Sequence, residues 1–320
     1  MNTRLALATL PRSTARRASG ALRLLGLLAS AVAAAQTYAP YAPYPTYASP
    51  PPPPAPPANY DAGRATPDAV SAFVGSITQS TRFDSHSVTR WRAPLCFEVQ
   101  GLPEAEARYV AGRLSQIASW AGAQVDPACA KGAHNFYVMF TMNADQAAKD
   151  WYGRDRDLFD SNATQSQVRA FLYPRSPGAV RVWHSATLFR SDGSTLIPVD
   201  PGDPVEPMPD RSQTGSRLPL QATAGLNFAL VIIDGSKANG AGLGQLADYS
   251  AMAGLADLDL DADVGNVPTI LRLFNEHSYA RPLGLTAWDQ TFLHALYHSN
   301  ESPRNLRAAI AGSMTRNMAL

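Results

Sequence analysis

Charge is scarce in this chain, and net charge is scarcer still. Of its 320 residues 17% are charged, and 27 basic side chains against 26 acidic ones leave a formal net charge of +1. Nucleic-acid binding usually needs a clustered basic surface, so the composition gives no indication of a nucleic-acid partner. The 45% share of hydrophobic residues is nevertheless enough to bury a sizeable core.

Long apolar runs are missing beyond residue 35, so we expect no transmembrane span in the mature chain. The first 35 residues have the pattern of a secretory signal peptide. A basic region that includes Arg16 and Arg17 precedes an apolar stretch, residues 24–35, which ends in a run of alanines. This pattern predicts export, with the protein periplasmic or secreted. A retained membrane-anchoring segment is the alternative.

Motifs for common cofactors are incomplete. Gly240-Ala241-Gly242-Leu243-Gly244 lies between a predicted strand and a predicted helix, but no Walker lysine follows and the full dinucleotide fingerprint is absent. Aspartates alternate with other residues from Asp257 to Asp263, yet the glycine and closing glutamate of an EF-hand are not at the required positions. We therefore expect no cofactor. A solvated loop is the default for the aspartates, with a calcium site as the alternative.

Cysteine is almost absent too, since the chain has only two, Cys96 and Cys129. In an exported protein an even pair commonly forms a disulfide, because the compartment is oxidising. Closing a loop of about 30 residues stabilises the fold by on the order of 3 kcal/mol through restriction of the unfolded chain. We therefore predict a Cys96–Cys129 disulfide, with two buried free thiols as the alternative.

What the chain does contain, after the signal, is a Pro- and Tyr-rich segment. In residues 36–65, Tyr-Ala-Pro units lead into five consecutive prolines that end at Pro54. Such sequence favours extended polyproline II and packs no core. We expect a disordered linker that acts as a semi-rigid spacer, with a recognition ligand for another protein as the alternative. Folded sequence begins near Thr66.

Strand and helix patterns alternate over residues 66–301, which we expect to form one domain. Thr66-Pro67-Asp68 predicts a helix over 67–78 with Thr66 as its cap and proline at its first position. Apolar residues recur at helical spacing in the long segment 103–121, and a short helix is expected at 144–151. Strand patterns cover 91–99, 136–142, 170–173, 180–189 and 226–233. Helices follow over 243–257, from Thr286 onward, where Thr286 and Asp289 match a capping box, and as a C-terminal helix or tail over 302–320. The order predicts an α+β fold: a mixed sheet backed by a long helix, then a helical half.

Strand, helix, tight apolar turn, helix is also the layout of the catalytic half of zincin metallopeptidases. Their metzincin motif, H-E-x-x-H-x-x-G-x-x-H/D, places two zinc-binding histidines one helical turn apart, with a glutamate that polarises the zinc-bound water. Laid on this motif, the chain has Asp248 at the glutamate, Gly254 at the glycine and Asp257 at the third ligand. Both helical histidines are replaced by alanines, Ala247 and Ala251, and alanine cannot ligate a metal.

The chain resembles a family of exported bacterial proteins of unknown function with a degenerate zincin-like layout. The resemblance covers residues 92–297 and rests on Leu246-Ala247-Asp248-Tyr249, Ala251-Met252, Pro268-Thr269-Ile270-Leu271, Leu285-Thr286 and Asp289. It implies a zincin-like scaffold whose metal site is lost. The alternative is an ordinary core helix, in which Asp248 is a surface acid or the partner of an arginine.

Histidines offer the remaining candidates for a site. His184 lies in an alternating strand, where a core histidine is the simpler interpretation and a general base in a cleft is the alternative. His294 and His298 are four residues apart on a predicted helix, so they share one face and form a metal site only if a third ligand arrives. A solvent-facing pair without metal is the simpler interpretation.

Together these patterns predict an exported, catalytically inactive zincin-like module that binds an envelope protein or polymer or has a structural role. The alternative is a peptidase-like hydrolase with a non-standard site drawn from Asp248, Asp257, His184 and the His294–His298 pair. An envelope adaptor that binds through its Pro- and Tyr-rich arm is a third hypothesis.

Overall fold

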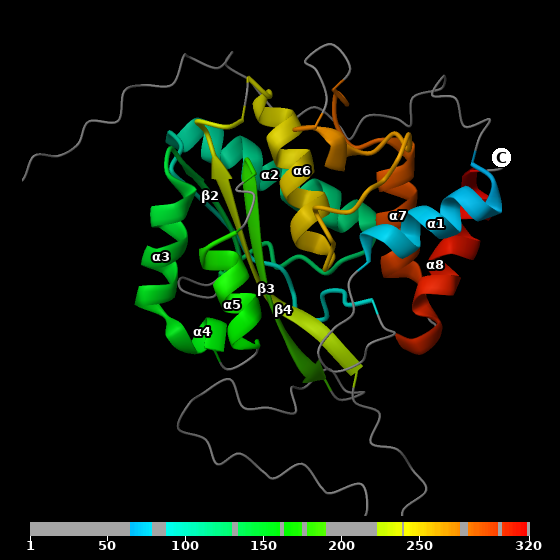
Figure 1. The fold of residues 1–320 in the computed structure, drawn as a ribbon, viewed down its shortest axis with the longest axis horizontal. Coiled ribbons are helices and arrows are strands. Elements are labelled where there is room, and N and C mark those ends of the chain that lie inside the picture. Colours follow the sequence, from blue (N-terminus) through cyan, green and yellow to red (C-terminus); the bar gives the residue numbers. More distant parts are fainter. Residues whose placement is uncertain are drawn as a thin grey trace, which may run out of the picture. The chain divides into compact units, whose positions relative to one another are not determined.

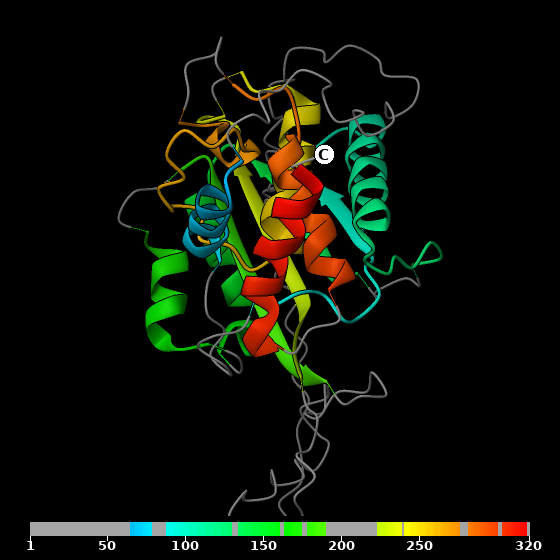
Figure 2. The ribbon, with the colours of Figure 1, turned by 90° about the vertical axis from the view of Figure 1, so that its right-hand side faces the viewer.

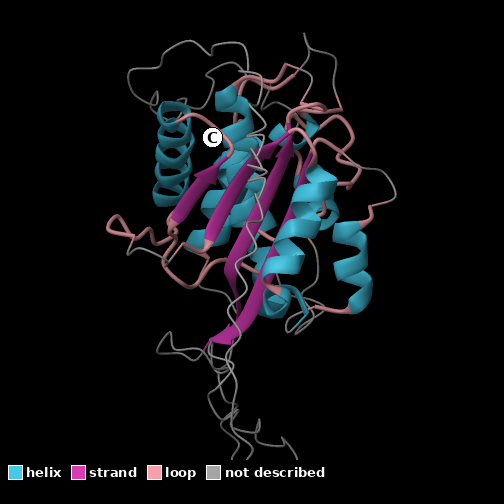
Figure 3. Ribbon diagram, turned by 90° about the vertical axis from the view of Figure 1, so that its left-hand side faces the viewer, coloured by secondary structure: helices cyan, strands magenta, loops and turns pink. Residues whose placement is uncertain are grey.

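A four-stranded mixed sheet lies at the centre of the fold, with its strands in the order β1-β2-β4-β3 (Figure 3). Strands β1 (Phe97–Gln100), β2 (Phe136–Thr141) and β4 (Thr223–Asp234) are parallel, and β3 (Val180–Phe189) pairs antiparallel with β4 at one edge. The connection from β1 to β2 contains the long helix α2 (Glu104–Ala121). The predicted α+β class with a mixed sheet is therefore confirmed.

The structure is a computed structural model that describes residues 65–78, 88–129, 134–160, 163–174, 178–189, 223–238, 240–275, 281–299 and 303–318. All of them belong to Pro45–Leu320, one of the two units into which the chain divides. The predicted signal peptide and all but the last residue of the predicted linker lie outside the described residues. Among the helices described, none is long and apolar enough to cross a membrane.

One face of the sheet is covered by α3 (Ala144–Arg154), α4 (Arg156–Asp160) and α5 (Gln165–Leu172) (Figure 1). These helices bury an aromatic cluster against β3 and β4. Its largest members are Trp151, Phe159, Phe171 and Phe228, together with Trp183 of β3. Phe159 lies 4.9 Å from Trp183 between ring centroids, so the helices pack directly on the edge strand. This face is a closed hydrophobic layer.

The opposite face carries α2 and α6 (Leu243–Leu255). Phe136 of β2 stacks on Trp91 and also lies against Gly254 near the end of α6. A Cβ atom added at Gly254 would come within 2.2 Å of the Phe136 ring, so only glycine permits this close approach of helix to sheet. The glycine of the zincin-like pattern is thus explained by packing.

The remaining helices form a group beside the sheet. Helix α8 (Pro303–Met318) packs against both α1 (Pro67–Ile77) and α7 (Ala287–His298) (Figure 2). Phe73 of α1 makes edge-to-face contacts with Trp288 and Phe292 of α7, at centroid distances of 5.3 and 6.4 Å. The Thr66 hydroxyl accepts the Ala69 amide at the start of α1, which confirms the predicted cap.

Two strand predictions were wrong. Strand β1 covers only Phe97–Gln100, while Trp91 and Leu95 of the predicted strand make isolated bridges. Residues 170–172 belong to helix α5, and Tyr173 is its C-cap. A helix forms here in place of the predicted strand because Thr164 and Gln167 form a reciprocal capping box and the apolar residues of α5 face the core at helical spacing.

Candidate functional site

The candidate site is built around α6, which follows β4 through a glycine-broken turn. Gly242 precedes the helix, and its amide donates to the side-chain oxygen of Gln245 at 2.8 Å. Every residue from Leu246 to Leu255 is buried, so α6 has no solvent face over that length. Helix α6 is therefore a core helix, and its polar side chains must find partners inside the protein.

Ala247 and Ala251, at the histidine positions of the zincin-like pattern, have no exposed surface. A catalytic zinc site keeps one coordination position open for water or substrate. Side chains packed on all sides leave no room for such an opening at these positions. The local packing is therefore that of a core and not of a metal-binding cleft.

Asp248, at the glutamate position of the zincin-like pattern, is only 2% exposed. Its carboxylate accepts hydrogen bonds from Nε and Nη2 of Arg113, at 2.6 and 2.9 Å, and so forms a bidentate ion pair between α6 and α2. The amide of Leu285 donates to Oδ2 at 2.9 Å. This aspartate thus joins two helices and the loop before α7, which leaves it poorly placed to activate a water.

Asp289 is a second buried carboxylate, and it organises the turn that follows the aspartate-rich loop. It accepts hydrogen bonds from the Thr269 hydroxyl and from the amides of Ile270 and Thr286. The 3-10 turn η2 (Ile270–Arg272) is thereby fixed to the start of α7. Burial raises the pKa of Asp289 to about 6, although the hydrogen bonds from Thr269, Thr286 and Ile270 act in the opposite direction.

The C-terminal end of α6 is closed by side chains from three distant segments. Trp91 Nε1 donates to the Gly254 carbonyl at 2.8 Å, and the Tyr297 hydroxyl donates to the Leu255 carbonyl at 2.6 Å. His184 Nε2 lies 3.3 Å from the same Gly254 oxygen. The last carbonyls of a helix lack partners within it, so these contacts satisfy groups that would otherwise be buried without a hydrogen bond.

His184 and Asp257 are brought together by the fold. His184 Nδ1 lies 3.6 Å from Asp257 Oδ1, and the side chains are 10% and 25% exposed. Asp248 belongs to a different set of contacts, with Arg113 and Leu285. Of the candidates Asp248, Asp257 and His184, the last two therefore share one location beside the end of α6, and Asp248 does not join them.

His294 and His298 stack on one face of α7, with ring centroids 3.9 Å apart. Burial and the neighbouring His298 lower the pKa of His294. In the described part of the chain, no third His, Cys, Asp or Glu side chain completes a metal-binding group with them. His298 is exposed, and its Nδ1 lies 3.0 Å from the His294 carbonyl.

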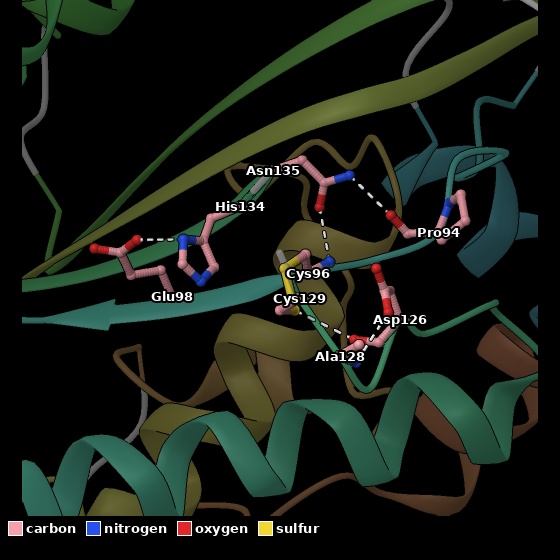
Figure 4. Close-up of a disulfide and its surroundings, with 8 residues drawn as sticks. All are labelled: Pro94, Cys96, Glu98, Asp126, Ala128, Cys129, His134 and Asn135. Atoms are coloured by element: carbon pink, nitrogen blue, oxygen red, sulfur yellow. Dashed lines mark hydrogen bonds and ion pairs between the residues drawn. A yellow bond between two sulfur atoms is a disulfide. The ribbon is translucent and has the colours of Figure 1, made fainter. Parts of the chain in front are cut away.

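The predicted Cys96–Cys129 disulfide is confirmed, and it joins two cysteines that are 33 positions apart in the sequence (Figure 4). It links the start of β1 to the segment that returns from α2. Asn135 supports this corner, because its Oδ1 accepts the Cys96 amide at 2.8 Å and its Nδ2 donates to the Pro94 carbonyl at 2.9 Å. His134 and Glu98 lie beside the disulfide, with His134 Nδ1 2.8 Å from Glu98 Oε2.

Sequence reasoning missed Arg113 and His134. Arg113 lies within the buried stripe of α2, three residues after Val110 and one before Leu114, and an arginine in such a stripe signals a buried acid as partner. His134 precedes β2 by two residues and is near Cys129 in sequence, but no metal-ligand spacing marks it. Comparison with family models, with curated proteins and with solved structures finds no match to this chain.

Proposed function

We propose that this protein is an exported module that keeps a zincin-like layout without peptidase activity and acts by binding or by a structural role in the periplasm or cell envelope. The observation that carries the proposal is the environment of Asp248. Its two oxygens are occupied by Arg113 and by the Leu285 amide, in a position with almost no exposed surface. A carboxylate that polarises a water needs a free oxygen facing an open cleft.

The buried alanines support the same conclusion independently. Zinc in a peptidase is held by at least three protein ligands, and Ala247 and Ala251 stand where two of them would be. Both alanines are wholly buried. Asp257 remains at the third-ligand position of the pattern, but its Oδ1 lies 3.6 Å from Nδ1 of His184 on the edge strand β3.

The test uses the oxidised, disulfide-bonded protein purified without chelators. We expect elemental analysis to find no stoichiometric zinc and a peptidase assay on unfolded protein substrates to show no chelator-sensitive cleavage. Chelator-sensitive proteolysis that persists in the purest fractions would overturn the proposal. The variant D248N is the internal control, because it should leave any contaminating activity unchanged.

Export and partner choice rest on the N-terminal sequence, which lies outside the described residues. The signal-like pattern of residues 1–35 supports export, and the Pro- and Tyr-rich segment supports a spacer between the domain and its partner. Fractionation of cells that express the full chain tests export, with deletion of residues 1–35 as the control. Recovery of both forms in the cytoplasm would contradict it.

A hydrolase with a non-standard site is the second candidate, and the contact between His184 and Asp257 favours it. A histidine oriented by a carboxylate is the usual arrangement of a general base. Hydrolysis of simple ester or peptide substrates that is lost in H184Q and in D257N, but retained in H298Q, would establish this reading. Equal activity in all of these variants would exclude a hydrolase site at His184 and Asp257, and would leave His184 only as a contact at the end of α6.

A further inference from the structure

The disulfide corner brings together more metal-ligating groups than a structural bridge needs. Ligand atoms of Cys96, Cys129 and His134 all lie within 4.8 Å of one another. Donor atoms around a tetrahedral zinc are roughly 3.5–3.8 Å apart, given Zn–S bonds of about 2.3 Å and Zn–N bonds of about 2.0 Å. Only small movements separate this arrangement from a tetrahedral ligand set once the bond between the sulfurs is broken.

Glu98 fixes the histidine in the orientation that metal binding requires. His134 Nδ1 lies 2.8 Å from Glu98 Oε2, so this nitrogen donates to the carboxylate. The proton on Nδ1 leaves Nε2 with the lone pair that binds a metal. A carboxylate behind a ligating histidine holds the ring and raises its basicity, which is the common second layer of zinc sites.

The corner is also reachable from solvent on one side. The side chains of His134 and Glu98 are 26% and 32% exposed, and Cys129 is partly exposed, whereas Cys96 is 2% exposed. Backbone contacts hold the group together without the disulfide, because the amides of Asn135 and Phe136 both donate to the Cys96 carbonyl. The geometry of Cys96 and His134 therefore depends on strand pairing as well as on the bridge.

We propose that this corner is a redox-gated zinc site. In the reduced protein, Cys96, Cys129 and His134 bind one Zn²⁺, Glu98 orients His134, and water takes the fourth position. In the oxidised protein the sulfurs are bonded to each other and the site is closed. The Cys₂His set with a soft thiolate pair selects zinc over calcium or magnesium.

The change of state balances with a dithiol as the reductant. The dithiol supplies two electrons and two protons, the Sγ–Sγ bond breaks, Cys96 and Cys129 become thiols, and the reductant becomes its own disulfide. Zn²⁺ then binds the two thiolates, and both thiol protons pass to solvent. A disulfide reverses these steps: it accepts two electrons from the two thiolates and two protons from solvent to become a dithiol, the Sγ–Sγ bond forms again, and Zn²⁺ is released.

The experiment titrates the mature protein with Co²⁺ and then Zn²⁺, in the oxidised form and after reduction with a phosphine that is removed under anaerobic conditions. Circular dichroism checks that the fold is retained. We expect thiolate-to-cobalt charge-transfer absorption in the reduced protein only, with one metal ion per chain and displacement by Zn²⁺. H134Q should weaken zinc binding at least 10-fold, and E98A by about 10–100-fold.

H298Q is the matched control, since it removes a histidine that lies on α7 outside the proposed site, and it should bind zinc as the parent protein does. The proposal is overturned if reduced protein gives no thiolate absorption, if H134Q binds as tightly as the parent, or if the reduced protein unfolds even with zinc present. Failure here leaves the proposed function intact, because that proposal concerns the oxidised protein and the region of α6.

Discussion

Asp248 and Asp289 are both buried carboxylates in the C-terminal half, but they are held by different partners. Asp248 is 2% exposed and faces the Arg113 guanidinium, whereas Asp289 is fully buried among neutral donors from Thr269, Ile270 and Thr286. Each ties a loop to a helix. The comparison separates two ways of stabilising a buried acid: a charge of opposite sign, and a set of aimed dipoles.

The difference has consequences for what each acid can do. A charged pair remains costly to break, because removal of one partner leaves the other as an isolated buried charge. A carboxyl held by neutral donors can instead take up a proton, and burial raises the pKa of Asp289 to about 6. Asp248 is thus a fixed structural link, while Asp289 responds to pH in the mildly acidic range.

The largest expected effect is that of R113M. This substitution leaves Asp248 buried without its cation, and we expect a loss of about 3–5 kcal/mol in the free energy of unfolding. Urea denaturation measures it. The double variant R113M/D248N should recover part of the loss, because the amide removes the charge and still accepts the Leu285 amide proton.

R108M is the control on the same helix. Arg108 pairs with Glu104 at 3.6 Å, but the side chains are 73% and 84% exposed. An exposed pair contributes roughly 0–1 kcal/mol, so R108M should barely change stability. If R113M destabilises the protein no more than R108M does, the ion pair with Arg113 does not stabilise Asp248. The proposed difference from Asp289, which is held by neutral donors, would then be wrong.

The next prediction concerns the pH dependence contributed by Asp289. Its pKa is about 6 in the folded protein against an ordinary value of 3.8, so between these values the folded state binds more protons than the unfolded state. Stability contributed by this group is therefore present below pH 4 and is lost as pH rises to about 6. The full effect is at most about 3 kcal/mol, from 1.36 kcal/mol per unit of pKa.

D289N isolates this effect, because the amide oxygen still accepts the Ile270 and Thr286 amides while the titration is removed. The difference in unfolding free energy between parent and D289N, measured from pH 4 to 7, should change in favour of the variant up to about pH 6 and then stay constant. A constant difference across the whole range would mean that the hydrogen bonds outweigh burial.

Much of the fold follows from local patterns. Apolar periodicity predicts α2, α6 and α7, and the Thr286–Asp289 pair predicts where α7 begins, because a capping box is encoded within four residues. Helix α5 escaped prediction because its apolar residues are few and its last residues also fit a short strand. Strand β1 is shorter than its alternating pattern, since pairing with β2 extends only over Phe97–Gln100.

The site was less accessible from sequence. Two cysteines have only one possible pairing, so the disulfide was predictable. Arg113 and Asp248 are 135 residues apart, and His184 approaches Asp257 only after β3 joins the sheet edge. Long-range pairs of this kind depend on the register of helices and strands, which a single sequence does not give. The zincin-like pattern singles out Asp248 and Asp257, but it does not identify Arg113 or His184 as their partners.

The smallest expected effect is that of G284A, which probes how closely the loop before α7 approaches Asp248. A Cβ atom at Gly284 would lie 2.5 Å from Asp248 Oδ2, so either the loop or the carboxylate must move. We expect a loss of about 1 kcal/mol, at the lower end of the range for an overpacked contact, because Gly284 is only half-buried. Because the clash involves this carboxylate, the loss should shrink when G284A is made in a D248A background, as a double-mutant cycle will measure.

G153A is the control, since nothing lies within 4 Å of a Cβ at Gly153 in α3, and alanine should there stabilise the helix slightly. Equal losses from G284A in both backgrounds would show that the loop is positioned without reference to Asp248.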